Sequence, residues 1–161
     1  MLPMRAYSIV LFSLLSVATS AIAADITGKP KVIDGDTIEL GGQRVRLHGI
    51  DAPEAKQICH TGKKNRPFPC GQFATRTLSD LVRGKTVTCK GDERDRYGRL
   101  IAVCYIDRVD INEQMVSRGW ALAYRRYSQD YVRAEQSAQH MKDGLWKHKF
   151  VPPWDWRRRK R

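Results

Sequence analysis

The chain has 161 residues, of which 29 are Lys or Arg and 17 are Asp or Glu, and its formal net charge is +12 at pH 7. Its 42% hydrophobic content is too high for a disordered chain. After the signal-like start, no apolar run approaches the roughly 20 residues that cross a bilayer. These numbers indicate one globular domain with a basic surface, and they favour a polyanionic partner such as nucleic acid or an anionic membrane.

The first 23 residues have the organisation of a secretory signal peptide. Arg5 supplies a basic start, residues 9–17 form an apolar core, and Ala21-Ile22-Ala23 is a small-x-small cleavage motif. The alternative is a membrane anchor, but the apolar core is short for a spanning helix. We therefore expect cleavage after residue 23 and export to a periplasmic or extracellular location.

Four cysteines suit the oxidising environment outside the cytoplasm, and three pairings are formally open. Local pairings are favoured, because a turn brings Cys89 beside Cys104 on neighbouring strands, while Cys59 and Cys70 bracket a Pro/Lys-rich loop. The rival interpretation is a zinc site. It is disfavoured because no Cys-x-x-Cys spacing occurs and the four residues lie on separated elements.

The hydrophobic pattern predicts strands first and helices later. Strands are expected at residues 31–33, 37–40, 43–49, 86–90 and 100–106, and helices at residues 72–82, 110–119 and 128–144. Asp110 and Ser128 are the expected N-caps of the last two helices. Five strands with about three helices suit a mainly β member of the α+β class, a closed barrel of the oligonucleotide-binding type. This domain is expected over residues 24–150, followed by a basic tail at residues 151–161.

Two short stretches concentrate carboxylates at strand ends. Residues 34–37 read DGDT and residues 51–54 read DAPE. Hard cations such as calcium take oxygen ligands from carboxylates, carbonyls and water, so converging loops of this kind favour a metal site. The alternative is ordinary turn punctuation, because Asp-Gly pairs and prolines are common turn formers.

Two arginines extend this picture. Arg46 lies in a strand that leads to Asp51, and Arg99 closes the turn at residues 95–99. Planar guanidinium groups bind phosphate oxygens in a bidentate manner and stabilise the extra charge of a phosphodiester transition state. The alternative is that both arginines form weak surface ion pairs.

Three motifs in this order resemble the signatures of the staphylococcal nuclease (thermonuclease) family: VIDGDT at residues 32–37, VRLHGIDAPE at residues 45–54 and DRYGR at residues 95–99. The similarity extends from about residue 29 to residue 146. It implies an oligonucleotide-binding-type barrel with three helices and one calcium ion. It also implies an endonuclease that cleaves DNA and RNA at the bond to the 5′ oxygen and leaves 3′-phosphate ends. No protein partner is implied, and a monomer is expected.

The resemblance also implies which residues bind the metal. The calcium ligands fall on the carboxylates of Asp36 and Asp51 and on the backbone carbonyl of Ala52. The family usually has Thr where this chain has Ala52. Because the ligand there is a main-chain oxygen, Ala is expected to serve, with the loss of a hydroxyl interaction.

The same resemblance assigns the remaining site residues. Glu54 matches the carboxylate that activates or positions the attacking water. Arg46 and Arg99 match the arginines that bind the scissile phosphate. Tyr97 and Tyr124 match positions near the terminal phosphate and the nucleotide base, although tyrosines beside a barrel often serve packing alone.

The chain departs from the family pattern in a shorter hairpin between Asp36 and Arg46, which ends in Gly41-Gly42, and in a cysteine-closed loop at residues 55–70, while the tail lies beyond the family domain. The cysteine-closed loop carries Lys63 and Lys64, which we expect to attract phosphate at the rim of the substrate groove, unless the loop is only a solvated basic surface. The tail ends in Arg157 and four further basic residues. Such a run is commonly disordered, or it tethers nucleic acid or an anionic surface.

Two other functions compete with a secreted calcium-dependent nuclease. One is a noncatalytic nucleic-acid-binding barrel, which the complete set of acidic and arginine residues disfavours. The other is a surface-interaction protein that functions through its tail, with the barrel as a scaffold.

Overall fold

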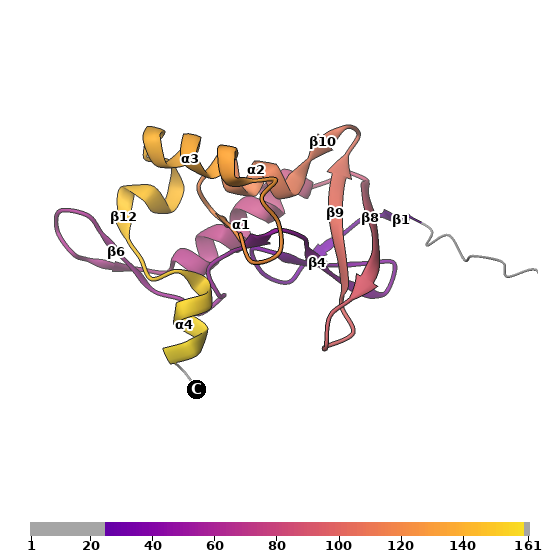
Figure 1. Cartoon of the computed structure of the whole chain (residues 1–161), viewed down its shortest axis with the longest axis horizontal. Coiled ribbons are helices and arrows are strands. Elements are labelled where there is room, and N and C mark those ends of the chain that lie inside the picture. The colour runs from indigo at the N-terminus through magenta and orange to yellow at the C-terminus, as the bar shows by residue number, and fades with distance from the viewer. Residues whose placement is uncertain (1–24, 160–161) are drawn as a thin grey trace, which may run out of the picture.

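The computed structural model describes residues 25–159 of the chain (Figure 1). The strands are β1 (Ile26–Gly28), β2 (Lys31–Val32), β3 (Thr37–Leu40), β4 (Gln43–Leu47), β5 (Ile50–Asp51), β6 (Cys59–Thr61), β7 (Pro67–Phe68), β8 (Val87–Arg94), β9 (Leu100–Ile106), β10 (Val109–Asp110), β11 (Leu122–Ala123) and β12 (His148–Lys149). The helices are α1 (Cys70–Val82), α2 (Ile111–Ser117), α3 (Val132–Met141) and α4 (Pro153–Arg159), with a 3-10 turn at Gly144–Lys147. The expected signal peptide lies outside the described residues. Within residues 25–159, no helix has the length and apolar character needed to cross a membrane.

The main sheet has the strand order β1-β8-β9-β4-β3-β2, and β10 pairs with β9. The β3–β4 hairpin turns at Gly41 and Gly42, whose φ angles of 57° and 76° fit the left-handed turns that match strand twist. β4 pairs in parallel with β9, while β8 and β9 form a long antiparallel hairpin. The α+β class expected from the sequence is thus confirmed, and residues 25–159 contain several short strands besides the five expected.

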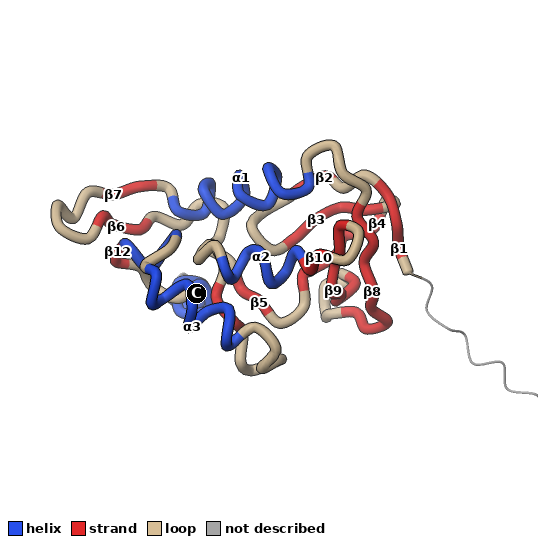
Figure 2. Tube along the Cα trace, turned by 90° about the horizontal axis from the view of Figure 1, so that it is seen from above, coloured by secondary structure: helices blue, strands red, loops and turns tan. Residues whose placement is uncertain are grey.

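The core lies between this sheet and the helices α1 and α2, as the view in Figure 2 indicates. Ile38 and Val45 of the β3–β4 hairpin belong to one buried cluster with Leu78 of α1 and Met115 of α2, and all four are fully buried. Inward residues alternate with exposed ones such as Arg44, as expected for a sheet with one face toward the core. The buried strands therefore give the hairpin a fixed position.

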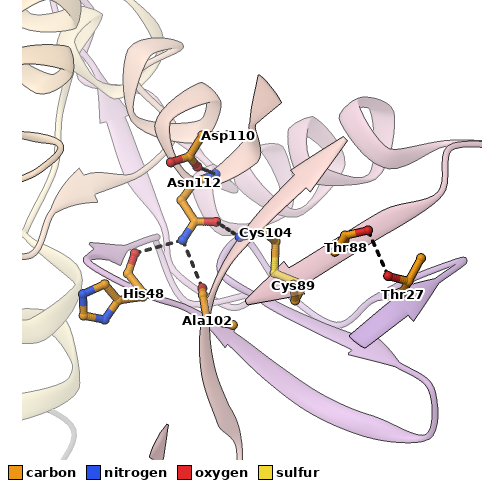
Figure 3. Close-up of a disulfide and its surroundings, with 8 residues drawn as sticks. All are labelled: Thr27, His48, Thr88, Cys89, Ala102, Cys104, Asp110 and Asn112. Atoms are coloured by element: carbon orange, nitrogen blue, oxygen red, sulfur yellow. Dashed lines mark hydrogen bonds between the residues drawn. A yellow bond between two sulfur atoms is a disulfide. The ribbon is translucent and has the colours of Figure 1, made fainter. Parts of the chain in front are cut away.

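Both expected disulfides are present. Cys89 and Cys104 face each other in the β8–β9 register and are bonded, as are Cys59 and Cys70. Beside the first bond, the buried side chain of Asn112 accepts from the Cys104 amide and donates to the carbonyls of His48 and Ala102 (Figure 3). One amide thus joins α2 to the strand β9 and to the end of β4.

A second, smaller cluster lies around the Cys59–Cys70 bond. Its buried members include Leu122 and Leu145, and Trp154 of α4 packs against it. The β6–β7 hairpin and β12 form a separate three-stranded sheet beside this cluster. The disulfide therefore links the start of α1 to the region on which the C-terminal helix rests.

The expected helix boundaries are partly correct. Asp110 caps α2 by accepting from the amides of Asn112 and Glu113, as predicted. Ser128 does not cap α3: its hydroxyl accepts from the Asp130 amide two residues later, and the helix begins only after Tyr131. A serine followed by a local turn competes with capping in this way.

Candidate active site

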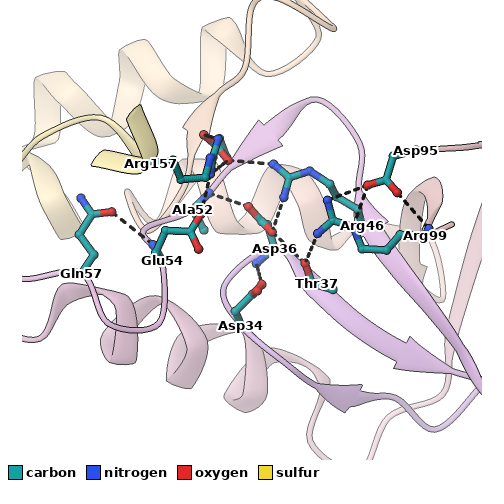
Figure 4. Close-up of polar contacts among 11 residues, drawn as sticks. Asp34, Asp36, Thr37, Arg46, Ala52, Glu54, Gln57, Asp95, Arg99 and Arg157 are labelled. Carbon is teal, nitrogen blue, oxygen red and sulfur yellow. Dashed lines mark hydrogen bonds and ion pairs between the residues drawn. The ribbon is translucent and has the colours of Figure 1, made fainter. Parts of the chain in front are cut away.

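Two strand ends bring together the acidic residues of the predicted site. Asp36 directly precedes β3, and Asp51 ends β5. Arg46 of β4 lies between them, with one guanidinium nitrogen 2.8 Å from Asp36 Oδ1 and the other 2.8 Å from Asp51 Oδ1 (Figure 4). Because Thr37 and Arg46 are register partners, the hairpin itself sets this arrangement.

Further hydrogen bonds fix the Asp36 carboxylate. The Ala52 amide donates to Oδ2 at 3.0 Å, and the Thr37 hydroxyl lies 3.0 Å from Oδ1, so the carboxylate is tied to both strand ends. The Asp36 amide in turn donates to Asp34. Asp36 is 4% exposed and Asp51 is fully buried, so the two carboxylates are arranged in advance rather than freely solvated.

Arg99 approaches the same cluster from the turn after β8. Its Nε lies 2.7 Å from Asp95 Oδ2, and a second nitrogen lies 3.4 Å from the Thr37 hydroxyl. Its guanidinium also lies over the Tyr97 ring, 5.6 Å from the centroid. Thr37 therefore links Arg99 to the Asp36 carboxylate, and the two arginines expected from the sequence reach one site.

Glu54 lies on the loop after β5, and its side chain is 39% exposed. Its amide donates to the buried side chain of Gln57, which also donates to the Val151 carbonyl at 2.8 Å. Gly71 passes close to this loop: a Cβ built there would lie 1.7 Å from the Glu54 carbonyl oxygen. The first turn of α1 thus supports the loop that carries Glu54.

Arg157 of α4 is a site residue that the sequence did not reveal. Its guanidinium makes a bidentate pair with Asp51, at 2.9 and 2.7 Å, and reaches Glu54 Oε1 at 2.7 Å. Arg157 therefore lies across the carboxylates of one predicted metal ligand and of the predicted general base (Figure 4). In the sequence it is one member of a terminal basic run, which contains no signal that distinguishes it from its neighbours.

The carboxylates of the site lie close together and are mostly buried, and this shifts the pKa values of the groups around them. Burial and the neighbouring Asp36 raise the pKa of Asp34 to about 6. Burial also raises the pKa of Asp51, with repulsion from Asp36 adding to it, while hydrogen bonds from Arg157 oppose this shift. Burial lowers the pKa of Arg46, but attraction to Asp36 and Asp51 outweighs it and the net shift is upward. The site thus concentrates negative charge that requires cations.

The donor set fits a hard cation in its chemistry. Asp36 and Asp51 supply carboxylate oxygens, and the Ala52 carbonyl belongs to the same strand end, which matches the oxygen ligands of calcium. Within residues 25–159, no group of three or more His, Cys, Asp or Glu side chains has an arrangement that could hold a metal ion. Two guanidinium groups, from Arg46 and Arg157, balance the carboxylate charge in this arrangement.

The remaining expected site residues lie at different distances from this cluster. Tyr124 follows β11 directly, its amide bonds to the Gly49 carbonyl, and its ring stacks on Trp154 with centroids 5.4 Å apart. Tyr97 is 67% exposed beside Arg99. Lys63 and Lys64 are exposed in the β6–β7 hairpin, which projects from the side of the body in Figure 1. Within the described residues, neither lysine has a hydrogen bond or ion pair to the carboxylate cluster.

Comparisons with known proteins find one matching family model and several similar relatives. A model of the family described as "Staphylococcal nuclease homologue" matches residues 44–148. An "Uncharacterized endonuclease" of Escherichia coli O157:H7 is 40% identical over 148 residues, which cover 86% of this chain and 90% of the relative. An "Uncharacterized endonuclease" of Haemophilus influenzae is 40% identical over 139 residues, covering 81% and 72%. The "Succinoglycan biosynthesis protein ExoI" of Rhizobium meliloti is 34% identical over 146 residues, covering 89% and 76%.

Proposed function

Because the chain belongs to the staphylococcal nuclease family, we propose that it is an exported, calcium-dependent endonuclease that hydrolyses phosphodiester bonds of DNA and RNA. The observation that carries the proposal is the convergence of Asp36, Arg46, Asp51, Glu54 and Arg99 at one end of the sheet. The two disulfides suit an oxidising, exported environment. The proposed organisation is a signal peptide at residues 1–23, a nuclease domain at 24–150 and a tail at 151–161.

The carboxylates of Asp36 and Asp51, with the Ala52 carbonyl, would hold the calcium ion. When bound, calcium supplies positive charge that offsets the charge of the phosphodiester and of the carboxylates around it. The chain's own residues do the rest of the binding and proton transfer. Arg46 and Arg99 bind the oxygens of the scissile phosphate, and they stabilise the charge that increases as the bond to the attacking water forms.

Glu54 accepts a proton from the attacking water as the new phosphorus–oxygen bond forms. The bond between phosphorus and the 5′ oxygen breaks, and that oxygen takes up a proton from the solvent. One water is consumed, and the products are a 3′-phosphate end and a 5′-hydroxyl end. Contacts through phosphate, ribose and stacked bases carry little sequence information, so the enzyme is expected to cleave with broad sequence tolerance.

The test is digestion of single-stranded DNA and RNA by residues 24–161, with calcium, with a chelator, and with calcium restored. Glu54→Gln is expected to slow cleavage by about 100-fold or more. Glu113→Gln makes the same change in charge at an exposed residue of α2 and is expected to cleave at the normal rate. The products should support polymerase extension only after phosphatase treatment, because their 3′ ends carry phosphate.

Two results would contradict the proposal. Cleavage that continues at the same rate in the chelator would exclude calcium dependence. Binding of DNA without any cleavage would favour the noncatalytic nucleic-acid-binding barrel instead.

A further inference from the structure

The tail helix α4 lies where the proposed reaction requires open space. Arg157 contacts both oxygens of Asp51, and it also contacts Glu54. Asp51 is a proposed calcium ligand and Glu54 the proposed base, so a single side chain covers the two functions. A guanidinium paired in a bidentate manner with a buried carboxylate holds oxygens that a cation would need.

A second contact covers the proposed base-binding position. The indole of Trp154 stacks on Tyr124, with an interplanar angle of 9° and a centroid separation of 5.4 Å. This parallel arrangement is the one that a nucleotide base adopts on an aromatic platform. The face of Tyr124 that contacts Trp154 is therefore closed to any other ring while α4 is docked.

The docked position of α4 depends on these contacts and on a few others nearby. The helix has seven residues, and isolated helices of that length are unstable in water. Its position depends on the Arg157 ion pairs, the packing of Trp154, the buried Pro153 and the bond from Gln57 to the Val151 carbonyl just before the helix. Loss of the Arg157 contacts would thus remove a large share of what orders the helix.

We propose that α4 is an autoinhibitory segment whose docking and the binding of a divalent cation exclude each other. This inference rests on the proposed function, because it takes the carboxylates of Asp51 and Glu54 as parts of the active site. With α4 docked, Arg157 neutralises these carboxylates and Trp154 covers Tyr124. Cation binding displaces Arg157 and exposes both the proposed base and the stacking surface.

Mutual exclusion is a negative coupling, and such a coupling is reciprocal. A change that weakens docking of α4 must strengthen cation binding. In turn, cation binding must lower the equilibrium constant for docking of α4 by the same factor. Couplings between sites typically change affinity by roughly 5- to 150-fold. The two directions can be measured separately, and neither measurement requires catalysis.

The first experiment measures calcium affinity by titration calorimetry on residues 24–161 and three variants. Arg157→Gln removes the competing guanidinium, and Trp154→Ala weakens the dock without any change of charge. Arg159→Gln is the matched control, because it makes the same charge change on the same helix at an exposed side chain. We expect affinity to rise by about tenfold in the first two variants and to stay within twofold in the control.

The outcomes separate the possibilities. Unchanged affinity in Arg157→Gln, or no binding heat in any variant, overturns the proposal. A rise in Arg157→Gln without one in Trp154→Ala also overturns it, because local charge would then explain the effect without a docking helix. If affinity rises in both variants but no variant cleaves nucleic acid, the proposed function fails while the coupling between α4 and the cation stands.

The second experiment reads the reverse direction by hydrogen exchange of the unmodified chain. Calcium is expected to increase amide exchange in residues 154–159 while leaving exchange in the buried strands β4 and β9 unchanged. Slower or unaltered exchange in α4 would show that the helix stays docked with the cation bound, which contradicts the proposal. In cleavage assays, Arg157→Gln should exceed the unmodified chain at low calcium and match it at saturating calcium.

Discussion

Arg46 and Arg157 contact the same Asp51 carboxylate from different parts of the chain, and they are held there by different means. Arg46 belongs to β4, whose backbone pairs with β3 on one side and β9 on the other. Arg157 belongs to the short helix α4, which is anchored by the ion pairs of Arg157 itself and by the packing of Trp154. One guanidinium is therefore fixed by the sheet, while the other occupies its position only as long as its contacts outcompete alternatives.

We call Asp36, Arg46 and Arg99, which lie on or beside the main sheet, the sheet side of the site, and Arg157 with α4 the tail side. The largest effect on stability and cleavage is expected on the sheet side. Arg46→Ala leaves Asp36 without its cation and Asp51 with only Arg157, so we expect unfolding free energy to fall by about 3 kcal/mol. Cleavage should also fall by about 100-fold or more, because a phosphate ligand is lost. Arg44→Ala, on the same strand with an exposed side chain, is the control for urea unfolding and DNA digestion. Equal effects of the two substitutions would contradict the assigned role of Arg46.

Removing each disulfide in turn tests whether calcium affinity depends on the packing under α4 or on the stability of the whole domain. Replacing Cys59 and Cys70 with Ala, or Cys89 and Cys104 with Ala, should each lower unfolding free energy by about 3 kcal/mol, because the loops closed are of similar length. Only the first pair lies in the cluster against which Trp154 packs. Calcium affinity should therefore rise in the Cys59/Cys70 variant alone. An equal rise in both variants would show that general destabilisation, rather than the dock, controls cation binding.

Arg99 offers an intermediate case on the sheet side. Its partner Asp95 lies only four residues earlier in the same turn, and both side chains are partly exposed, so we expect the pair to contribute about 1 kcal/mol. Arg99→Lys is expected to leave thermal stability nearly unchanged while slowing cleavage by about tenfold or more, since lysine cannot bind phosphate in a bidentate manner. Arg96→Lys serves as the control in the same turn. A cleavage rate that matches the control would remove Arg99 from the proposed transition-state contacts.

The smallest effect is expected at the projecting hairpin. Replacing Lys63 and Lys64 with Ser should reduce the salt dependence of single-stranded DNA binding by about 1.4 units of logarithmic slope if both contact phosphate. Replacing the exposed Lys85 and Arg108 with Ser removes the same charge elsewhere and should change the slope less. A slope equal to that of the control would show that the hairpin is only a solvated basic surface.

The sheet side of the site was predictable from the sequence, whereas the tail side was not. Motif order and strand alternation placed Asp36, Arg46 and Asp51 together, because the backbone register between neighbouring strands converts sequence spacing into position. The N-cap at Asp110 followed from local hydrogen-bonding chemistry in the same way. Arg157 is separated from Asp51 by more than a hundred residues, and its pairing depends on side-chain packing that no local pattern specifies.

The prediction for Ser128 was wrong because a local turn used its hydroxyl before the helix began. The burial of Asn112 was missed for a different reason: its side chain bonds to backbone groups of β9 and of His48, and a polar residue at the start of a helix has no sequence mark of burial. Sequence reasoning therefore succeeded where strand register or a single local cap decides the structure. It failed where distant groups meet through side chains, as at Arg157 and Asn112, and where two local structures compete for one hydroxyl, as at Ser128.

The close approach of Gly71 to the Glu54 loop limits which sequences can carry this site. Because any Cβ at position 71 would meet a backbone oxygen, the strain cannot be relieved by rotating a side chain. Random mutagenesis aimed at new substrate ranges should consequently recover glycine at this position in every active clone. Exposed neighbours such as Gln72 are free to vary, so useful diversity near the proposed base has to come from the outer face of α1.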